Sequence, residues 1–245
     1  MPGMQSQIKP IASIDSSPPA LRGISSMATR QLLADLLALY AQQSDERMAI
    51  ESVGGVDAAK RVQAGEAFDA VFLASDAIDK LIAAGHIDAQ SKVNLVHSGV
   101  AVAVRAGAAL PDISSEDAVR SAVLAAGSIS YSTGPSGVAL VKLFERWGIA
   151  AAIADRIVQA PPGVPVGALV ARGEVELGFQ QLSELINLDG ITVVCPLPPA
   201  IQITTTFSAG VCTGSSQAPA VRDLLAFMCS PQADEAKRRQ GMEPA

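Results

Sequence analysis

Short apolar runs of strand length alternate with amphipathic helical segments along most of this chain, and this alternation limits the fold more than any other feature. Residues 21–24, 70–74 and 100–104 are such runs, while residues 27–42 and 116–125 repeat apolar side chains at helical spacing. Strands separated by helices tend to pair in parallel, because the intervening helix returns the chain to the same edge. The sequence therefore predicts an α/β fold with a largely parallel sheet covered by helices on both faces.

The remaining expected elements continue the same alternation. Further strands are expected at residues 48–53, 128–132, 177–180, 192–195 and 202–212, and further helices at residues 57–64, 75–84, 138–147, 220–229 and 232–240. Residues 1–19 are expected to form a flexible N-terminal arm, because Pro and Ser interrupt each short apolar stretch there.

Charge and hydropathy exclude several classes of partner. The net charge is −6, and the only basic cluster is the short run at residues 237–239, so nucleic acid is not an expected partner. No window of about 18 uninterrupted apolar residues occurs, so no membrane insertion is expected. Residues 1–21 lack the apolar centre of a secretory signal. As written, the sequence predicts a cytoplasmic protein, and a periplasmic one if a signal has been removed.

The sequence contains no recognisable cofactor, metal or nucleophile motif. Its cysteines, Cys195, Cys212 and Cys229, form no C-x-x-C pair, and only two histidines are present, so no metal site is expected. Apolar neighbours predict that all three thiols are buried and free. The phosphate-binding loop, the dinucleotide fingerprint and the G-x-S-x-G elbow are absent. We therefore expect no cofactor.

Three expected strand ends share one polar feature, a run into Ser or Thr followed at once by a helix. The residues concerned are Ser25, Ser26, Ser75, Ser132, Thr133, Gly134, Ser136 and Gly137. Hydroxyls together with unpaired N–H groups at helix N-termini bind anions without formal positive charge. Because ligands of open α/β sheets lie beyond the carboxyl ends of the strands, the pattern predicts an anion site. The alternative is that these residues are ordinary helix N-caps.

Two glutamines and one arginine extend this candidate site. Gln180 and Gln181 follow an apolar strand and offer neutral donors and acceptors to a carboxylate or oxyanion, or they are surface residues in a turn. Arg30 lies one helical turn beyond Ser26, where it either faces the ligand or covers the surface.

Five segments carry a resemblance to a known family. They are SSMATRQLLADLLALYA, FLASD, SYSTGPSG, GEVELGFQQLSEL and FMCSPQADEAKRRQGMEP. In this order the chain, over residues 20–245, resembles the molybdate-binding-like branch of extracytoplasmic solute-binding proteins. The resemblance implies a two-lobed type 2 periplasmic-binding-protein fold, each lobe a mostly parallel sheet flanked by helices, with two crossing strands as the hinge. One lobe would comprise residues 20–99 and 204–245, the other residues 100–203.

The resemblance also implies ligand contacts. The family's oxyanion contacts fall on Ser25 or Ser26, on Ser75, and on the turn at residues 132–136, whereas a tyrosine of many molybdate binders aligns with Gln181. That departure favours an organic carboxylate over molybdate. The segment GFQQLSEL is similar to a sub-branch of substrate-binding-domain proteins that includes aconitate isomerase.

Three functions remain open at this point. The first is binding of a small anion, an organic polycarboxylate, in the cleft between the lobes. The second is isomerisation of such a polycarboxylate by moving a proton and a double bond. The third is a molybdate or oxyanion receptor of an ABC transporter, with a permease as partner only if the chain is exported. Weak candidates for the base are Asp76, Glu184 and His97, although Asp76 suits a helix cap and Glu184 a solvent-facing position.

Overall fold

The computed structural model describes residues 20–161 and 163–245, so the expected arm at residues 1–19 lies outside the described residues. The described residues form one nine-stranded sheet in the order β2-β1-β3-β8-β4-β6-β5, with β7 and β9 also paired to β4. The strands are β1 (Leu21–Ser26), β2 (Met48–Val53), β3 (Ala70–Ala74), β4 (Val93–Arg105), β5 (Ile129–Tyr131), β6 (Leu177–Gln181), β7 (Ile191–Pro196), β8 (Thr204–Val211) and β9 (Met242–Pro244).

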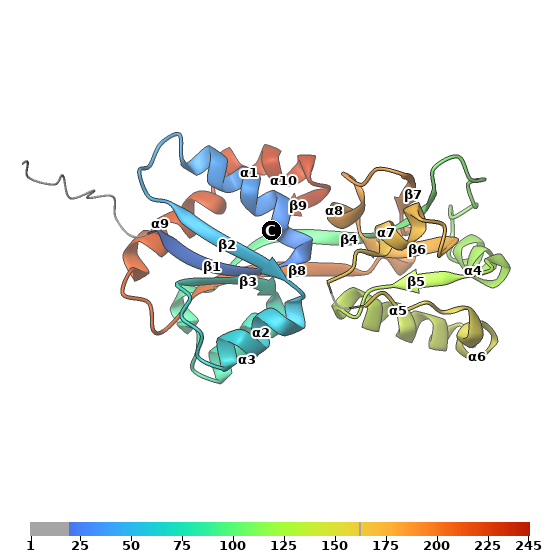
Figure 1. Cartoon of the computed structure of the whole chain (residues 1–245), viewed down its shortest axis with the longest axis horizontal. Helices are drawn as coiled ribbons and strands as arrows, with labels where there is room; N and C mark the ends of the chain where they lie inside the picture. The colour runs from blue at the N-terminus through green and yellow to red at the C-terminus, as the bar shows by residue number, and fades with distance from the viewer. Residues whose placement is uncertain (1–19, 162) are drawn as a thin grey trace, which may run out of the picture.

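Helices cover both faces of this sheet (Figure 1). The α-helices are α1 (Arg30–Tyr40), α2 (Gly55–Gln63), α3 (Ser75–Ala83), α4 (Glu116–Ala125), α5 (Pro135–Arg146), α6 (Ala150–Ile153), α7 (Val166–Ala171), α8 (Leu182–Leu185), α9 (Ala218–Met228) and α10 (Asp234–Arg239). Short 3-10 turns are η1 (Met27–Thr29), η2 (Ala89–Ser91), η3 (Ala154–Arg156), η4 (Pro199–Ile201) and η5 (Pro231–Ala233).

The long strand β4 joins two halves of the sheet. Its start pairs with β8 and β9, and its end pairs with β6 and β7. We call β1, β2, β3, β8, β9 and the start of β4 the first sheet half, and β5, β6, β7 and the end of β4 the second sheet half. The halves lie end to end in Figure 1, with β4 and β8 running between them.

The sheet is mixed rather than largely parallel, which corrects the prediction. The pairs β1–β2, β1–β3 and β5–β6 are parallel, but every pair made by β4 or β8 is antiparallel. The reason lies in two long connections. β4 leaves the first half and β8 returns to it, so both run against the strands that flank them. The alternation of strands and helices along the sequence does not show which strands pair in opposite directions.

Each half of the sheet has its own core on both faces. In the first half, α1, α9 and α10 pack on one face, where Leu32, Leu36 and Phe72 are fully buried, and α2 and α3 pack on the other. In the second half, α4 and α5 cover one face around Phe179, while α7 and α8 cover the other. The apolar stripe of α1, spaced at three and four residues, explains its buried side.

The structure also shows the length of the helices and the exposure of the cysteines. Among the described residues, none of the helices combines the length and the apolar character needed to cross a bilayer. The three thiols are free as expected, but only Cys212 is buried, whereas Cys195 and Cys229 are exposed. Cys195 lies near the end of β7, which among the described strands pairs with β4 alone.

Candidate functional site

The carboxyl ends of the parallel strands in the two halves face each other. β3 runs antiparallel to β8 and β8 antiparallel to β4, so β1, β2 and β3 all point toward the second half. β6 runs antiparallel to β4, so β5 and β6 point back toward the first half. Figure 1 shows the arrowheads of β2 and β5 directed toward one another. We call this region the strand-end boundary.

Strand register gives the separation of the two sets of strand ends measured along β4. Ala74 at the end of β3 pairs with Phe207, which pairs with Val96 of β4, while Gln181 at the end of β6 pairs with Val100. Four residues of β4 separate these levels, which at about 3.3 Å per residue is roughly 13 Å. Because β8 and β4 lie between β3 and β6, the ends of β3 and β6 are also offset across the sheet.

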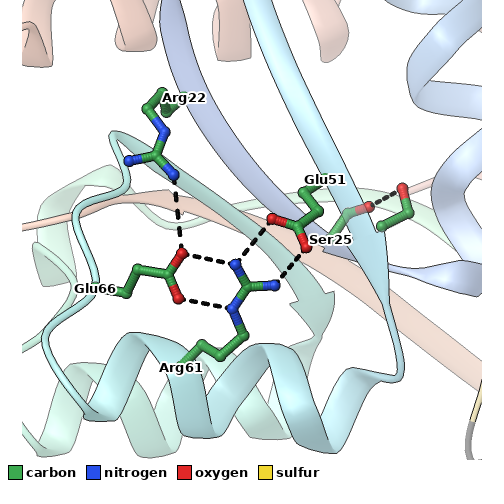
Figure 2. A network of polar contacts seen from close by, with 6 residues as sticks. Arg22, Ser25, Glu51, Arg61 and Glu66 are labelled. Carbon is green, nitrogen blue, oxygen red and sulfur yellow. Dashed lines mark hydrogen bonds and ion pairs between the residues drawn. The ribbon is translucent and has the colours of Figure 1, made fainter.

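On the first half, the two neighbouring serines of β1 differ in their contacts. Ser25 Oγ lies 2.8 Å from Ser52 Oγ, which links β1 to β2 (Figure 2). The Oγ of Ser26 is buried and has no hydrogen-bond partner among the described residues. A Cβ at Gly55, the first residue of α2, would lie 3.6 Å from the Cβ of Ser26. Ser26 therefore lies beside the N-terminus of α2 with its hydroxyl unengaged.

An ion-pair network holds α2 to β1 and β2 (Figure 2). Arg61 of α2 donates to both oxygens of Glu51 at 2.6 and 2.8 Å and to both oxygens of Glu66 at 2.6 and 2.7 Å, while Arg22 lies 3.8 Å from Glu66. The hydrogen bonds from Arg61 lower the pKa of both carboxyls. Because these groups are exposed and paired with one another, the network fixes α2 and supplies no free charge to the boundary.

On the second half, the turn after β5 packs tightly against the start of α5. A Cβ at Gly137 would lie 1.8 Å from the carbonyl oxygen of Ser132, a distance at which only glycine fits. Ser136 and Gly137 are buried, Ser132 and Gly134 are half-buried, and Thr133 is exposed. The predicted glycine-rich turn thus brings its backbone close to the N-terminus of α5.

Gln181 ends β6 and faces the two strands that cross the boundary. Its Nε2 donates to Thr205 Oγ1 at 2.9 Å, and Thr205 pairs with Ser98 of β4. Both the Oε1 of Gln181 and the Oγ of Ser98 are buried and lack a partner within the described residues. Together with Ser26 Oγ, these are three unpaired polar oxygens at the boundary. The two serine hydroxyls can donate to a ligand oxygen, whereas Gln181 Oε1 can only accept.

Gln180 and Glu184 form a second polar group on the opposite face of β6. The backbone N–H of Gly167, in the first turn of α7, donates to Gln180 Oε1 at 3.3 Å, and Gln180 Nε2 donates to Glu184 Oε2 at 2.7 Å. Burial raises the pKa of the Glu184 carboxyl to about 7, against a smaller lowering by the hydrogen bond from Gln180. Glu184 therefore does not face solvent freely, contrary to the alternative weighed from the sequence.

The other sequence candidates lie around this region in different environments. Ser75 is the half-buried first residue of α3, directly after β3. Arg30 begins α1 with an exposed side chain. Asp76 is exposed, makes no cap hydrogen bond and pairs with Lys80 at 3.7 Å. His97 is exposed on β4, with Nδ1 3.0 Å from Thr206 Oγ1.

Contacts already connect the halves on the side of α8. Ser183 Oγ donates to the carbonyl of Ala28 in η1 at 3.0 Å. Asn187 donates to Gln240 at 2.9 Å, and Gln240 in turn donates to Asp35 of α1 at 2.7 Å. The short helix α8 therefore lies between the second half and η1, at the strand-end boundary.

Sequence reasoning missed three residues of this arrangement. Ser98, Thr205 and Gly167 carry no motif, and they meet the predicted residues only through strand pairing and through the packing of α7 on β6. The one signal for the Gln180–Glu184 contact is their separation of four residues. Within residues 20–161 and 163–245, no group of three or more His, Cys, Asp or Glu side chains is arranged to hold a metal ion.

Comparison with known proteins identifies the family and the fold of this chain. The profile of the family described as bacterial extracellular solute-binding protein matches residues 21–243. Aconitate isomerase of a Pseudomonas species is 40% identical over 185 residues, which cover 75% of this chain and 70% of that protein. The periplasmic molybdate-binding protein of Azotobacter vinelandii is 18% identical with a TM-score of 0.77, covering 92% of this chain and 99% of that one.

The sulfate-binding protein SubI of Mycobacterium tuberculosis is 15% identical with a TM-score of 0.74, covering 92% of this chain and 87% of that one. At these identities the two binding proteins establish the α/β fold with its mixed sheet and flanking helices, and nothing about the ligand. The family profile spans nearly the whole described chain. This chain therefore belongs to the bacterial extracellular solute-binding protein family and has a molybdate-binding-protein-like fold.

Proposed function

We propose that the chain binds a small organic polycarboxylate at the strand-end boundary. The two sheet halves act as lobes, residues 20–99 with 204–245 and residues 100–203, and β4 and β8 act as the hinge between them. The observation that best supports this proposal is that strand ends from both halves face each other. These ends present hydroxyls, an amide and helix N-termini. Such groups hold carboxylate oxygens without a formal positive charge.

The second half favours a carboxylate over a tetrahedral oxyanion. Gln181 stands where the family's molybdate binders often have a tyrosine, and its free Oε1 is an acceptor that repels a fully ionised oxyanion. A polycarboxylate carries apolar carbon between its charged ends, and this neutral part of its surface can lie against the amide oxygen without repulsion.

Calorimetric titration tests this binding. Molybdate, sulfate, citrate, cis-aconitate and trans-aconitate are titrated separately into the protein at one ionic strength, because electrostatic binding depends on salt. We expect a tricarboxylate to bind at least about 100-fold more tightly than either inorganic anion. Tight molybdate binding with no response to the carboxylates would refute the proposal and favour an oxyanion receptor.

A second candidate function is isomerisation of the bound polycarboxylate, as in the aconitate isomerase to which the chain is 40% identical. The observation that favours it is the desolvated carboxyl of Glu184 beside the strand-end boundary, with a pKa of about 7. A general base that works near neutral pH needs a pKa in this range.

NMR in deuterated water tests the isomerase. The protein is incubated with trans-aconitate, and the vinyl proton signals of the two isomers are followed over time. We expect the cis isomer to accumulate, with deuterium entering the carbons that exchange protons. A sample that binds the ligand yet shows neither conversion nor exchange is a binding protein only.

A further inference from the structure

We infer that Glu184 carries the moving proton of this isomerisation and that Gln180 positions its carboxyl. The inference rests on the isomerase function proposed above and assigns the base within it. It starts from the place of α8, which begins at Leu182, directly after the end of β6. Ser183, next to Glu184, contacts Ala28 of the first half. Glu184 is therefore one residue from a contact that spans the strand-end boundary.

The side chain of Gln180 orients the carboxyl of Glu184. Because the N–H of Gly167 donates to Gln180 Oε1, the amide nitrogen of Gln180 must face the other way, toward Glu184 Oε2. Gln180 itself is buried, which restricts its rotation. Glu184 Oε2 is thus held, while Oε1 accepts no hydrogen bond from any residue in the described part of the chain. One oxygen anchors the carboxyl and the other is free to take a proton.

No charge nearby stabilises the ionised form of Glu184. The elements η1, β6 and α7 that surround α8 contain no ionisable side chain. On the remaining neighbours, the titratable groups are His97 and Arg105 of β4, Cys195 of β7, and the charged residues of α10 and β9, whose connecting Gly241 packs on Leu182 of α8. None of them contributes to the raised pKa. Burial is therefore unopposed by any cation, and at neutral pH the carboxyl is present in both protonation states.

The two protonation states of Glu184 match the two steps of an allylic proton shift. The Glu184 carboxylate removes a proton from the CH₂ carbon that lies between a carboxylate and the double bond, breaking one C–H bond. The electron pair spreads over the three-carbon unit and its carboxylates, whose charge is held by donors at the strand ends. Protonated Glu184 then returns the proton to the far carbon, where a new C–H bond forms as the double bond moves. The substrate is neither oxidised nor reduced.

The alternative bases fit this role less well. The side chain of Asp76 is 63% exposed and pairs with Lys80 at 3.7 Å, so it is not shielded from water. His97 is exposed and its Nδ1 contacts Thr206. Of the three sequence candidates, only Glu184 combines an anchored oxygen, a free oxygen and a desolvated site.

The test compares Glu184→Gln with the control Glu145→Gln, an exposed glutamate near the far end of α5. The turnover number is measured by NMR conversion of trans-aconitate, and the dissociation constant by calorimetry. We expect Glu184→Gln to lower kcat at least about 100-fold, the usual contribution of a general base, while its Kd stays within about threefold. Glu184→Asp, which keeps a carboxylate, should recover part of the rate, and Glu145→Gln should match the wild type.

Gln180→Leu tests the positioning role through the pH profile. Loss of the hydrogen bond that lowers the pKa of Glu184 should move the acidic limb of kcat/KM to higher pH, which a purely structural role would not do. If the wild type converts aconitate and Glu184→Gln does so within threefold, the assignment of Glu184 is overturned and the isomerase function stands. If the wild type binds aconitate without converting it, the isomerase function fails and this inference fails with it.

Discussion

The two sets of strand ends that face each other differ in the polar groups they present. The first half offers the hydroxyls of Ser26 and Ser75 at the starts of η1 and α3. The second half offers a glycine-rich turn, the amides of Gln180 and Gln181, and the carboxyl of Glu184. On our proposal, the first half holds the anion and the second half both holds it and moves its proton.

The two halves are also stiffened by different means. In the first half, the exposed Arg61 network ties α2 to the strands through ion pairs. In the second half, the turn after β5 depends on the absence of a side chain at Gly137. Ion pairs at the surface tolerate substitution, whereas a backbone contact that excludes even a methyl group does not. Substitutions in the two halves should therefore differ in their effect on stability.

Replacing glycine by alanine should lower stability strongly at Gly137 in the second half and only slightly at Gly55 in the first half. Gly137→Ala places a methyl group 1.8 Å from the carbonyl oxygen of Ser132, so the turn must move, and we expect a loss of about 3 kcal/mol in the free energy of unfolding. Gly55→Ala meets Ser26 at an ordinary 3.6 Å and should change stability by less than about 0.5 kcal/mol. Urea unfolding of both variants checks this, and equal losses would contradict the contrast.

The buried carboxyl of Glu184 should make stability depend on pH. Its pKa is raised from 4.5 to about 7, so its contribution is fully present below about pH 4.5 and is lost as the pH rises through 7. Glu184→Gln lacks this loss. Relative to the wild type, it should therefore gain on the order of 2 kcal/mol between pH 5 and pH 8. Chemical unfolding across this range measures the gain.

Glu174→Gln is the matched control for that pH series. The hydrogen bond from Arg172 lowers the pKa of Glu174, so any contribution is present above the unfolded pKa and is lost as the pH falls. The pH dependence of stability that Glu174 contributes is thus opposite in sign to that of Glu184. Because Arg172 and Glu174 are both exposed, the effect should be small. A flat difference between Glu184→Gln and the wild type would show that the carboxyl is solvated.

Substitutions of the two neighbouring serines of β1 should affect ligand binding and stability differently. Ser26→Ala removes a buried hydroxyl without a protein partner, so stability should change by less than about 0.5 kcal/mol while ligand affinity falls about tenfold. Ser25→Ala breaks the contact with Ser52, so stability should fall by about 1 kcal/mol with affinity unchanged. Paired unfolding and calorimetry measurements check both, and the reverse pattern would assign the ligand contact to Ser25.

The smallest effect is expected at Asp76. Its side chain is exposed and its ion pair with Lys80 spans one helical turn, so Asp76→Asn should cost less than about 0.5 kcal/mol. It should also leave aconitate turnover within about twofold of the wild type. A loss of turnover at this position would move the proton carrier to the first half and reverse the proposed division between the halves.

Local patterns in the sequence predicted the elements better than their pairing. The ranges 48–53, 70–74 and 116–125 match β2, β3 and α4 residue for residue, because apolar spacing and flanking turn residues are local properties. The expected strand at 100–104 is only the end of β4, which begins at Val93. Whether β4 and β8 run with or against their neighbours depends on contacts far apart in the chain, and the parallel prediction was wrong for that reason.

The candidate site was predicted in part for the same physical reason. Ser26, Ser75 and the turn at residues 132–137 follow strands whose ends are visible in the sequence, and the structure places them at ends that face one another. The environment of Glu184 was not visible, because a polar residue in a four-residue helix resembles a surface residue. Its burial comes from β6, which directly precedes α8, and from α7 and η1, whose packing against α8 depends on contacts that no local pattern predicts.

Competition observed by native mass spectrometry tests the central claim most directly. The protein is mixed with equal amounts of molybdate, sulfate, citrate and cis-aconitate, and the mass of the bound species is read from the intact complex. We predict one tricarboxylate per chain, because the strand-end boundary presents hydroxyls and amides that can hold carboxylate oxygens. A complex carrying molybdate or sulfate, or no adduct with any of the four, would contradict the account.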